Sequence, residues 1–524
     1  MMRIGVGTRW MGPDRMISWA VALVAAVAGG PPAGRAEPSQ RPNVLFIAID
    51  DLRPALGCYG DSLAKTPNID RLAGTGRQFL AAYCQQAVCG PSRTSLLTGR
   101  LPDNNRVWHN RQRFRLHEPD TVTLPQLFMR AGYRAESYGK VFSGTTAEED
   151  PESWSAPAVL KAEGWRNYVD RSAAGDGKGP ATEAADVDDE GYADGKLASL
   201  AIEALGRLRD GPFFLAVGFF KPHLPFNAPR QYWDLHDPAS FGAAETERTV
   251  GAAADAYPDH RELAGYAGMP RNEQVATDEA RRLRQGYYAC VSYVDAQVGR
   301  LLAALEEQGL ADTTIVVLWG DHGYSLGEAD HWCKATNFER DTRVPLMIRV
   351  PGMVAAGEPA AGLVEHVDIY PTLAELAGLE PPEEIDGRSL GPILRNPSAP
   401  GRPFALSQYP RPWKPQPPRT MGYSLRSPTH RYTRWVDWAD KRVVAEELYA
   451  YGRLPGRGDG PTPFVERTNV ATDPVQRAEL DRHRAALDGQ LAERLRPSAA
   501  KPLAVVEPGK KKKKGRREPS SDDD

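Results

Sequence analysis

The sequence is poor in cysteine and has almost no excess of charge of either sign. Its 524 residues include five cysteines, too few for a disulfide-built scaffold, and no CxxC pair of the kind that indicates structural zinc. Lys and Arg total 65 against 68 Asp and Glu, a formal net charge of −3, which gives no reason to expect nucleic acid as a partner. Because five is odd, at least one cysteine lacks an intramolecular partner, and this raises the question of its chemistry.

Hydrophobic runs of membrane-spanning length are also missing. The apolar stretch Ile17–Ala28 has 12 residues, too short to cross a bilayer comfortably. Three arginines precede it, and Gly34-Arg35-Ala36 places small residues at positions −3 and −1 of a cleavage site. This layout predicts a signal peptide over residues 1–36 and an exported protein, periplasmic or extracellular, without stable membrane insertion. An uncleaved membrane anchor is the alternative.

The sequence does contain short, continuous apolar runs. Val44–Ile49, Phe213–Phe219 and Ile315–Leu318 show no polar alternation, which is typical of strands buried on both faces, and Tyr133–Tyr138 is a weaker case. Helical patterns lie between them at Thr66–Gly74, Thr94–Thr98, Leu124–Ala131, Leu197–Arg209 and Arg281–Glu307. The alternation predicts an α/β fold over residues 41–397, with a doubly wound, mostly parallel sheet flanked by helices.

The pattern changes after residue 397. Short strand-like segments predict a smaller α+β domain with an antiparallel sheet over residues 398–500: Phe404–Gln408, Met421–Arg426, His430–Trp435 and Val444–Tyr449, followed by a helix over Gln476–Leu495. Residues 501–524 are expected to be a disordered charged tail, whose basic block Lys510–Lys514 is either solvated or in contact with an anionic surface. The polar segments Glu148–Gly195 and Pro238–Thr277 are either insertions at the rim of a site or loops without substrate contact.

Ionisable residues follow all four apolar runs. They are Asp50-Asp51, Gly139-Lys140, Lys221-Pro222-His223 and Asp321-His322-Gly323. Ligands bind at the carboxyl ends of parallel strands, so we predict one composite site. Two adjacent carboxylates repel each other unless a cation lies between them, and the oxygen-rich set indicates Ca²⁺ or Mg²⁺ rather than zinc. A helix N-cap or a surface pair is the alternative for Asp50 and Asp51 taken alone.

Cys89 lies just before a predicted helix, in Cys89-Gly90-Pro91-Ser92-Arg93. Pro91 is tolerated in a first helical turn, and the helix N-terminus together with Arg93 favours negative charge. We therefore predict a lowered pKa for the Cys89 thiol. An inert buried thiol is the alternative.

This pentapeptide, with Leu97-Thr98-Gly99-Arg100, resembles the signature of the type I, formylglycine-dependent sulfatases, and within them the iduronate-2-sulfatase branch. The resemblance extends from about Asn43 to about Tyr449 through Asp50–Pro54, Gly57–Asp61, Gln85–Cys89, Phe213–Gly218, Val291–Asp295, Ser407–Pro412 and Met421–Ser424. It implies an alkaline-phosphatase-like fold and hydrolysis of a sulfate ester on a sulfated sugar or uronic acid. It also implies a maturation enzyme that oxidises Cys89 to formylglycine.

The resemblance also implies roles for individual residues. The ligands of one calcium ion, preferred over magnesium, would be Asp50, Asp51, Asp321, His322 and the hydrated aldehyde made from Cys89. The catalytic residues would be Cys89 as the nucleophile, Arg93 to hold its gem-diol, Lys140 and Lys334 to neutralise the sulfate oxygens, and His223 to protonate the leaving alcohol. The substrate-binding candidates are Arg106, Lys414 and His109, each of which is otherwise an ordinary surface residue.

One position departs from the family pattern. After the Gly-Lys pair the family typically has a histidine that assists removal of the gem-diol proton, whereas this chain has Ser143, a poor base. His109 is the candidate to approach the site instead. Two other functions stay open: a phosphodiester or phosphonate hydrolase of the same superfamily, and a non-catalytic protein that binds sulfated glycans.

Overall fold

The computed structural model describes residues 41–143, 149–160, 168–170, 172, 178–258, 262–271, 274–413, 417–461 and 463–496. The predicted signal peptide, the predicted charged tail and Lys414 lie outside the described residues. No helix in the described ranges is long and apolar enough to cross a membrane.

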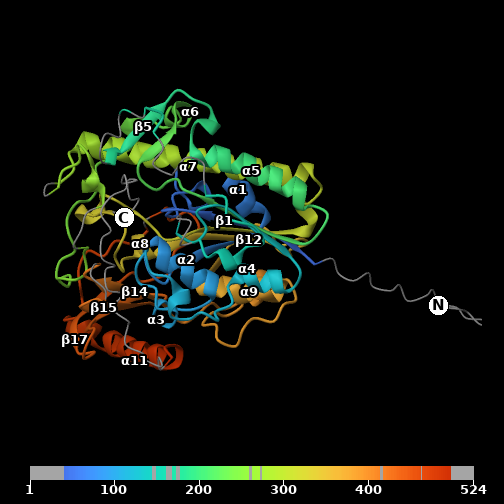
Figure 1. The fold of residues 1–524 in the computed structure, drawn as a ribbon. Helices are drawn as coiled ribbons and strands as arrows, with labels where there is room; N and C mark the ends of the chain where they lie inside the picture. Colours follow the sequence, from blue (N-terminus) through green and yellow to red (C-terminus); the bar gives the residue numbers. More distant parts are fainter. Residues whose placement is uncertain are drawn as a thin grey trace, which may run out of the picture. The chain divides into compact units, whose positions relative to one another are not determined.

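A seven-stranded sheet, ordered β13-β2-β12-β9-β1-β6-β3, forms the centre of the fold (Figure 1). Its strands are β1 (Asn43–Ile49), β2 (Arg77–Tyr83), β3 (Arg134–Gly139), β6 (Phe213–Phe219), β9 (Thr314–Gly320), β12 (Arg343–Arg349) and β13 (Ala360–Glu365). Strand β1 pairs in parallel with β6 and β9, and β6 pairs in parallel with β3. Strand β12 runs antiparallel to both of its neighbours. The mixed, mostly parallel sheet confirms the prediction.

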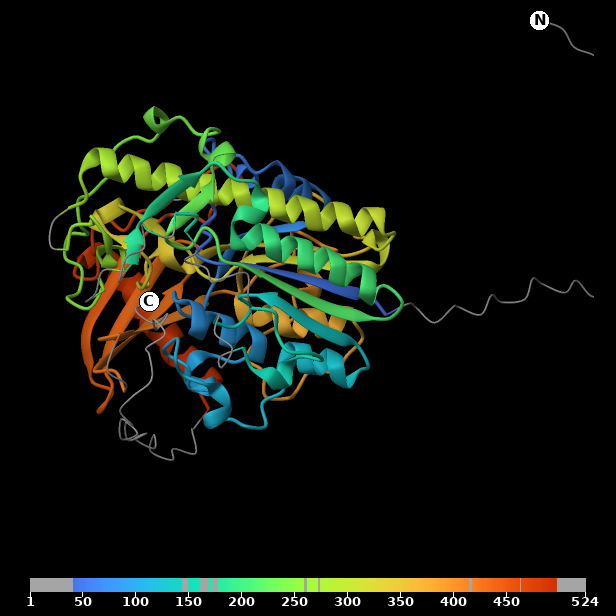
Figure 2. The same cartoon turned by 45° about the horizontal axis from the view of Figure 1, so that its top comes forward.

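Helices cover both faces of this sheet (Figures 1 and 2). One face carries α1 (Pro67–Thr75), α5 (Ala193–Leu208) and α7 (Thr277–Glu307); the other carries α2 (Cys89–Thr98), α4 (Leu124–Arg130) and α9 (Ile369–Leu376). Successive β1 side chains point to opposite faces of the sheet. Leu45 and Ile47 belong to the hydrophobic core that includes α1, α5 and α7, whereas Val44 and Phe46 belong to the core that includes α2, α4 and α9. Burial of each of these apolar side chains stabilises the folded state by roughly 1.5–3 kcal/mol. Because both faces of β1 are buried, its sequence is an unbroken apolar run.

The C-terminal region forms a second sheet, in which consecutive strands pair antiparallel. Its strands are β14 (Ala405–Arg411), β15 (Thr420–Arg426), β16 (His430–Asp437) and β17 (Val443–Ala450). Helix α11 (Arg477–Arg494) packs on it through Leu480 and Leu487, which share a core with Leu406 and Leu425. The antiparallel sheet confirms this part of the fold prediction, while the domain boundary at residue 397 stays a prediction.

Short elements connect these layers. They are α3 (Pro102–Asn105), α6 (Arg230–Trp233), α8 (Glu339–Thr342), α10 (Gly391–Arg395), β4 (Lys178–Pro180), β5 (Thr182–Ala185), β7 (Phe226–Pro229), β8 (Tyr266–Ala267), β10 (Ser325–Leu326) and β11 (Trp332–Cys333). The hairpin of β10 and β11 directly precedes Lys334. All five cysteines lie in described ranges, and none forms a disulfide.

Candidate active site

The four predicted strand endings meet at one edge of the central sheet. Strands β3, β6, β1 and β9 are neighbours in this order and run parallel, so their carboxyl ends lie side by side. Asp50 and Asp51 follow β1, Asp321 and His322 follow β9, and the backbone N–H of Asp51 donates to Asp321 Oδ1 at 2.9 Å. The endings of β1 and β9 are therefore in direct contact at this edge.

Helix α2 delivers Cys89 to this edge. The helix begins at Cys89, earlier than the predicted start at Thr94, because Pro91 fits within the first turn. Gly90 permits the close approach of Asn110, since a Cβ at Gly90 would lie 2.9 Å from the Asn110 Cα. The Cys89 Sγ lies 3.4 Å from His322 Nε2.

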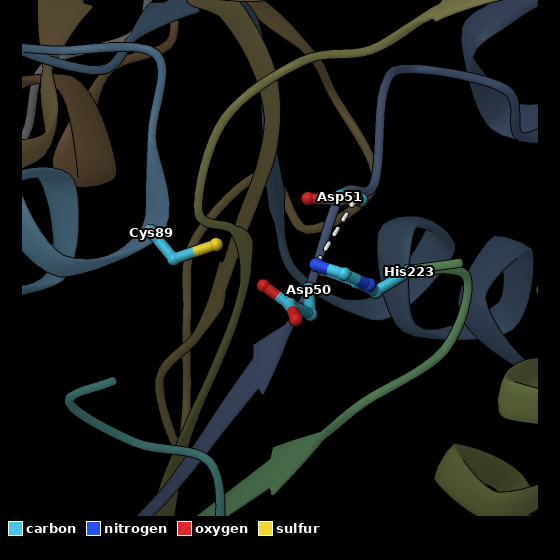
Figure 3. A group of neighbouring side chains, drawn as sticks. All are labelled: Asp50, Asp51, Cys89 and His223. Carbon is cyan, nitrogen blue, oxygen red and sulfur yellow. Dashed lines mark ion pairs between the residues drawn. The ribbon is translucent and has the colours of Figure 1, made fainter. Parts of the chain in front are cut away.

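Two overlapping sets of buried side chains could hold a metal ion, with ligand atoms all within 4.8 Å of one another: Asp50, Asp51, Cys89 and His223, and Asp50, Cys89, Asp321 and His322. In Figure 3 the Cys89 sulfur and the Asp50 carboxylate point toward each other, and the His223 ring lies beyond Asp50. The His322 Nδ1 bonds to the Gly323 carbonyl at 2.9 Å, which aims Nε2 at the cluster. Together the two sets offer three carboxylates, two imidazoles and the Cys89 thiol, and the carboxylate oxygens suit a hard cation.

Arg93 ties the carboxylates together. Its Nε donates to Asp321 Oδ2 at 2.8 Å and its Nη2 to Asp50 Oδ1 at 3.2 Å. Its Nη1 donates to the carbonyls of Lys140 and Val141. The guanidinium is fully buried, so it fixes the segment after β3 against the acidic cluster.

Two lysines pair with the two adjacent carboxylates, one with each. The Lys140 Nζ lies 2.6 Å from Asp50 Oδ2, and the Lys334 Nζ lies 3.0 Å from Asp51 Oδ1. Lys334 is flanked by Cys333 and Ala335, whose φ angles of 75° and 85° turn the backbone sharply at this point. Both ammonium groups therefore lie at the acidic cluster. Lys221, by contrast, donates to the carbonyls of His223 and Pro225 and supports the loop.

Glu262 was not predicted, yet it contacts two predicted catalytic residues. Its Oε2 lies 3.1 Å from Lys334 Nζ and its Oε1 lies 3.6 Å from His223 Nε2. The His223 Nδ1 bonds to the Leu224 carbonyl at 2.6 Å, and Nε2 also lies 3.9 Å from Asp51 Oδ2, the contact dashed in Figure 3. Since Glu262 belongs to the segment Pro238–Thr277, that insertion does reach the site.

Burial and mutual repulsion shape the electrostatics of the site. Burial opposes ionisation of Asp50, but Lys140 and Arg93 hold its pKa below the usual value. Burial raises the pKa of Asp51 well above the usual value, with Lys334 opposing this and with Asp50 and Glu262 adding to it. Burial also opposes ionisation of Asp321, but His322, Arg93 and Lys140 hold its pKa well below the usual value. Asp51 is therefore the carboxylate of the three whose negative charge an additional cation would stabilise.

The predicted lowering of the Cys89 pKa is wrong. Burial and the nearby Asp50 carboxylate raise the pKa of this thiol well above its usual value, despite Lys140 and Lys334. The helix N-terminus is outweighed because the thiol is fully buried beside an acidic cluster.

Two of the three substrate-binding candidates, His109 and Arg106, lie in the described part of the chain and contact residues outside the cluster. The His109 ring stacks on Trp413 at 4.4 Å between centroids, and Trp413 packs with Val88, which precedes Cys89. Arg106 lies at the end of α3, where its Nε is 4.0 Å from Glu118 Oε1. Lys414, the third candidate, belongs to the residues that the structure does not describe.

Comparisons with known proteins identify the family of this chain. The family model described as Sulfatase matches residues 42–379. Iduronate 2-sulfatase of Homo sapiens is 36% identical over 476 residues, covering 77% of this chain and 86% of that protein. N-acetylglucosamine-6-O-sulfatase of Bacteroides thetaiotaomicron is 29% identical over 414 residues, covering 69% and 72%.

A solved structure supports the fold. The phosphonate monoester hydrolase of Agrobacterium radiobacter superposes with a TM-score of 0.73 at 24% identity, covering 87% of this chain and 96% of that chain. The likeness confirms the predicted alkaline-phosphatase-like architecture.

Proposed function

This chain belongs to the sulfatase family, and from that premise we propose that it hydrolyses the sulfate ester of a sulfated sugar through a formylglycine made from Cys89. It is a sulfatase that resembles iduronate 2-sulfatase, and relatives carry names that refer to sulfated sugars. The observation that carries the mechanism is the convergence of Asp50, Cys89, Asp321 and His322 within 4.8 Å.

The proposed cofactor is one calcium ion held by Asp50, Asp51, Asp321 and His322. When bound, it supplies positive charge that lowers the cost of deprotonating a hydroxyl of the hydrated aldehyde. The donor set of oxygens with one imidazole and the raised pKa of Asp51 support a cation at this position.

The protein's own groups divide the remaining work. Arg93, fixed by Asp50 and Asp321, is placed to hold the modified side chain at position 89. Lys140 and Lys334 neutralise the charge that builds on the sulfate oxygens. His223 presents Nε2 to the leaving oxygen and gives it a proton, because its Nδ1 is already engaged by the Leu224 carbonyl.

We also propose that the protein is exported, with residues 1–36 removed as a signal peptide. The positively charged start, the short apolar stretch and the small residues before the cleavage point support this. Sequencing the N-terminus of protein secreted by the native host tests it; a mature chain beginning at Met1 would contradict it.

The function is tested on protein produced with a formylglycine-generating enzyme. The peptide containing Cys89 should lose about 18 Da on maturation, and the protein should release sulfate from sulfated sugars, whereas Cys89→Ala should release none. An unmodified Cys89 in protein from the native host would count against the mechanism. Faster hydrolysis of phosphonate than of sulfate esters by the same sample would favour the alternative hydrolase activity.

Calcium is tested by its removal. Chelation should abolish sulfate release and lower the melting temperature, and calcium at about 100 times its Kd should restore about 2.7 kcal/mol of stability. In Asp321→Asn, chelation and calcium addition should each change sulfate release and the melting temperature less than in the unmodified protein. Full activity after exhaustive chelation would contradict the proposed cofactor.

A further inference from the structure

A cavity of about 240 Å³ lies beside the nucleophile and has no part in the mechanism above. A single water needs only about 10–15 Å³ on a comparable measure, so the cavity has room for a much larger group. Gly90, Asn110, Arg113 and Ser143 are among its lining residues. Two of these, Gly90 and Ser143, directly link the cavity to the site.

The walls of the cavity are held by the groups that hold the nucleophile. Gly90 follows Cys89 in the chain, and its N–H donates to Asn110 Oδ1 at 2.9 Å. Near Ser143, Arg93 Nη1 donates to the Val141 carbonyl at 3.3 Å, two residues earlier in the chain. A group seated in the cavity would therefore have a fixed relation to an ester bound at Cys89.

The small side chain of Ser143 accounts for part of the volume of this cavity. The resemblance leads one to expect the larger histidine side chain at this position, and serine leaves room on the side where Gly90 and Phe142 also line the cavity. The substitution removes a potential base and at the same time widens the surroundings of the nucleophile.

The lining has the chemistry of a sugar-binding surface. Two lining side chains are aromatic: Phe114 and Phe142 are buried, with ring centroids 6.2 Å apart and an interplanar angle of 14°. Gln112 accepts from the Trp108 N–H through Oε1 and keeps its amide N–H groups for another partner. Flat apolar surface combined with amide donors suits a pyranose ring.

The cations on this lining differ in what they already bind. Arg115 is paired with Asp150 and with Glu152. Arg113 is exposed and forms no ion pair with a carboxylate among the described residues. Its guanidinium is thus the group on this wall that can take an anion from a ligand.

We propose that this cavity is a subsite for a second sugar ring of the substrate, and that Arg113 binds an anionic group, sulfate or carboxylate, on that ring. The inference rests on the proposed function and sharpens its substrate class to sulfated oligosaccharides with a further negative charge next to the scissile ester. A monosaccharide sulfate would leave the cavity unused.

Binding measured by calorimetry on the full-length Cys89→Ala protein tests this without turnover. The probes are a sulfated monosaccharide, a sulfated disaccharide with a neutral second ring, and the same disaccharide with a carboxylate or a second sulfate on that ring. Arg113→Ala should weaken binding of both anionic disaccharides about tenfold and leave that of the neutral disaccharide nearly unchanged. Arg209 is an exposed arginine at the C-terminal end of α5, and Arg209→Ala is the matched control. This variant should bind all of the probes as the Cys89→Ala protein does.

Filling the cavity gives a second measurement. Ser143→Phe should weaken binding of all disaccharides, while binding of the sulfated monosaccharide reports that the variant is folded. The proposal is overturned if Arg113→Ala affects neutral and anionic disaccharides alike, if both variants behave like Arg209→Ala, or if the disaccharides do not bind where the monosaccharide does. If the matured protein binds the anionic disaccharides in an Arg113-dependent way but releases no sulfate from them, the proposed function is wrong and the proposed subsite is still supported.

Discussion

At the scale of single residues, the site depends on how buried charges are shared. The Asp51 carboxylate contacts Lys334, and Lys334 in turn contacts Glu262, which also approaches His223. Glu262 is 6% exposed, so its negative charge acts on both groups with little screening by water. We therefore expect its carboxylate both to align Lys334 and His223 and to repel an incoming sulfate.

Glu262→Gln should separate these two effects. We expect kcat for a sulfated sugar to fall about tenfold, because Lys334 and His223 lose the charge that aligns them, and KM to fall because repulsion of the sulfate is relieved. Steady-state kinetics on matured protein measure both constants. Glu306→Gln, at a half-exposed position in α7, is the matched control. A rise in KM with unchanged kcat would show that Glu262 acts in substrate binding instead.

The sequence predicts part of this site for physical reasons. Asp50, Asp51, Asp321 and His322 follow unbroken apolar runs, and parallel strands bring such endings to one edge. Glu262 could not be found in this way, because it lies in a polar segment without periodicity, and its partners are distant in sequence. Lys334 and His223 were assigned roles through the family resemblance.

At the scale of elements, β1, β6 and β9 could be predicted because their runs are apolar, whereas β3, which carries Arg134 and Glu136, gave only a weak signal. β2 and β12 were missed because they carry buried polar residues. Arg77 in β2 is fully buried, and its guanidinium donates to the carbonyls of Val354 and Leu394. A charged residue at this position therefore does not mean that the segment lies at the surface. In β12, Pro345 interrupts the pattern at the register shift between Val344 and Leu346.

The end of β3 depends on a pair of glycines. Gly139 lies opposite Gly218 in β6 and has a φ of 80°, and a Cβ there would lie 2.1 Å from the Gly218 carbonyl oxygen. This turn allows the Lys140 N–H to bond to Gly218 and the Lys140 ammonium to reach Asp50.

Gly139→Ala should therefore destabilise the protein by about 2–4 kcal/mol, because it combines an unfavourable φ with a backbone clash. Sulfate release should fall with it, since Lys140 is displaced. Thermal melting and activity of the same preparation measure both. Gly206→Ala in α5, where the nearest atom to a new Cβ is 3.8 Å away, should instead be neutral or stabilising by up to about 1 kcal/mol. Equal melting temperatures for the two variants would contradict the role of Gly139.

At the scale of the whole described chain, buried ion pairs join the C-terminal sheet to the central one. Glu339 in α8 accepts from Arg426 in β15 and Arg431 in β16, and also from the hydroxyl of Tyr83 in β2. Glu365 in β13 is bound by Arg494 in α11. The candidate site lies on the central sheet, so its geometry is coupled to a C-terminal layer held partly by carboxylates.

These carboxylates make the attachment sensitive to acid. Burial opposes ionisation of Glu339, but Arg426 and Arg431 overcome it and lower its pKa to about 2 from 4.5. A carboxylate whose pKa is lower in the folded state stabilises fully above its unfolded pKa and loses that stabilisation as the pH falls toward its folded pKa. Its contribution, on the order of 3 kcal/mol, is thus complete above about pH 4.5 and falls to less than half by about pH 3.

Glu339→Gln should consequently lower the melting temperature at neutral pH, and the difference from the unmodified protein should shrink steadily between about pH 4.5 and pH 2. Calorimetric melts across this range measure the difference directly. Glu306→Gln, whose partner Arg71 is about half exposed, provides the matched control and should show a small, nearly constant difference. If Glu339→Gln lowered the melting temperature by the same amount at about pH 3 as at neutral pH, the cause would be lost packing rather than lost charge. Any acid sensitivity of the contact between the two sheets would then come from other groups. Glu365 is the first of these, because the pKa of its carboxyl is also lowered to about 2.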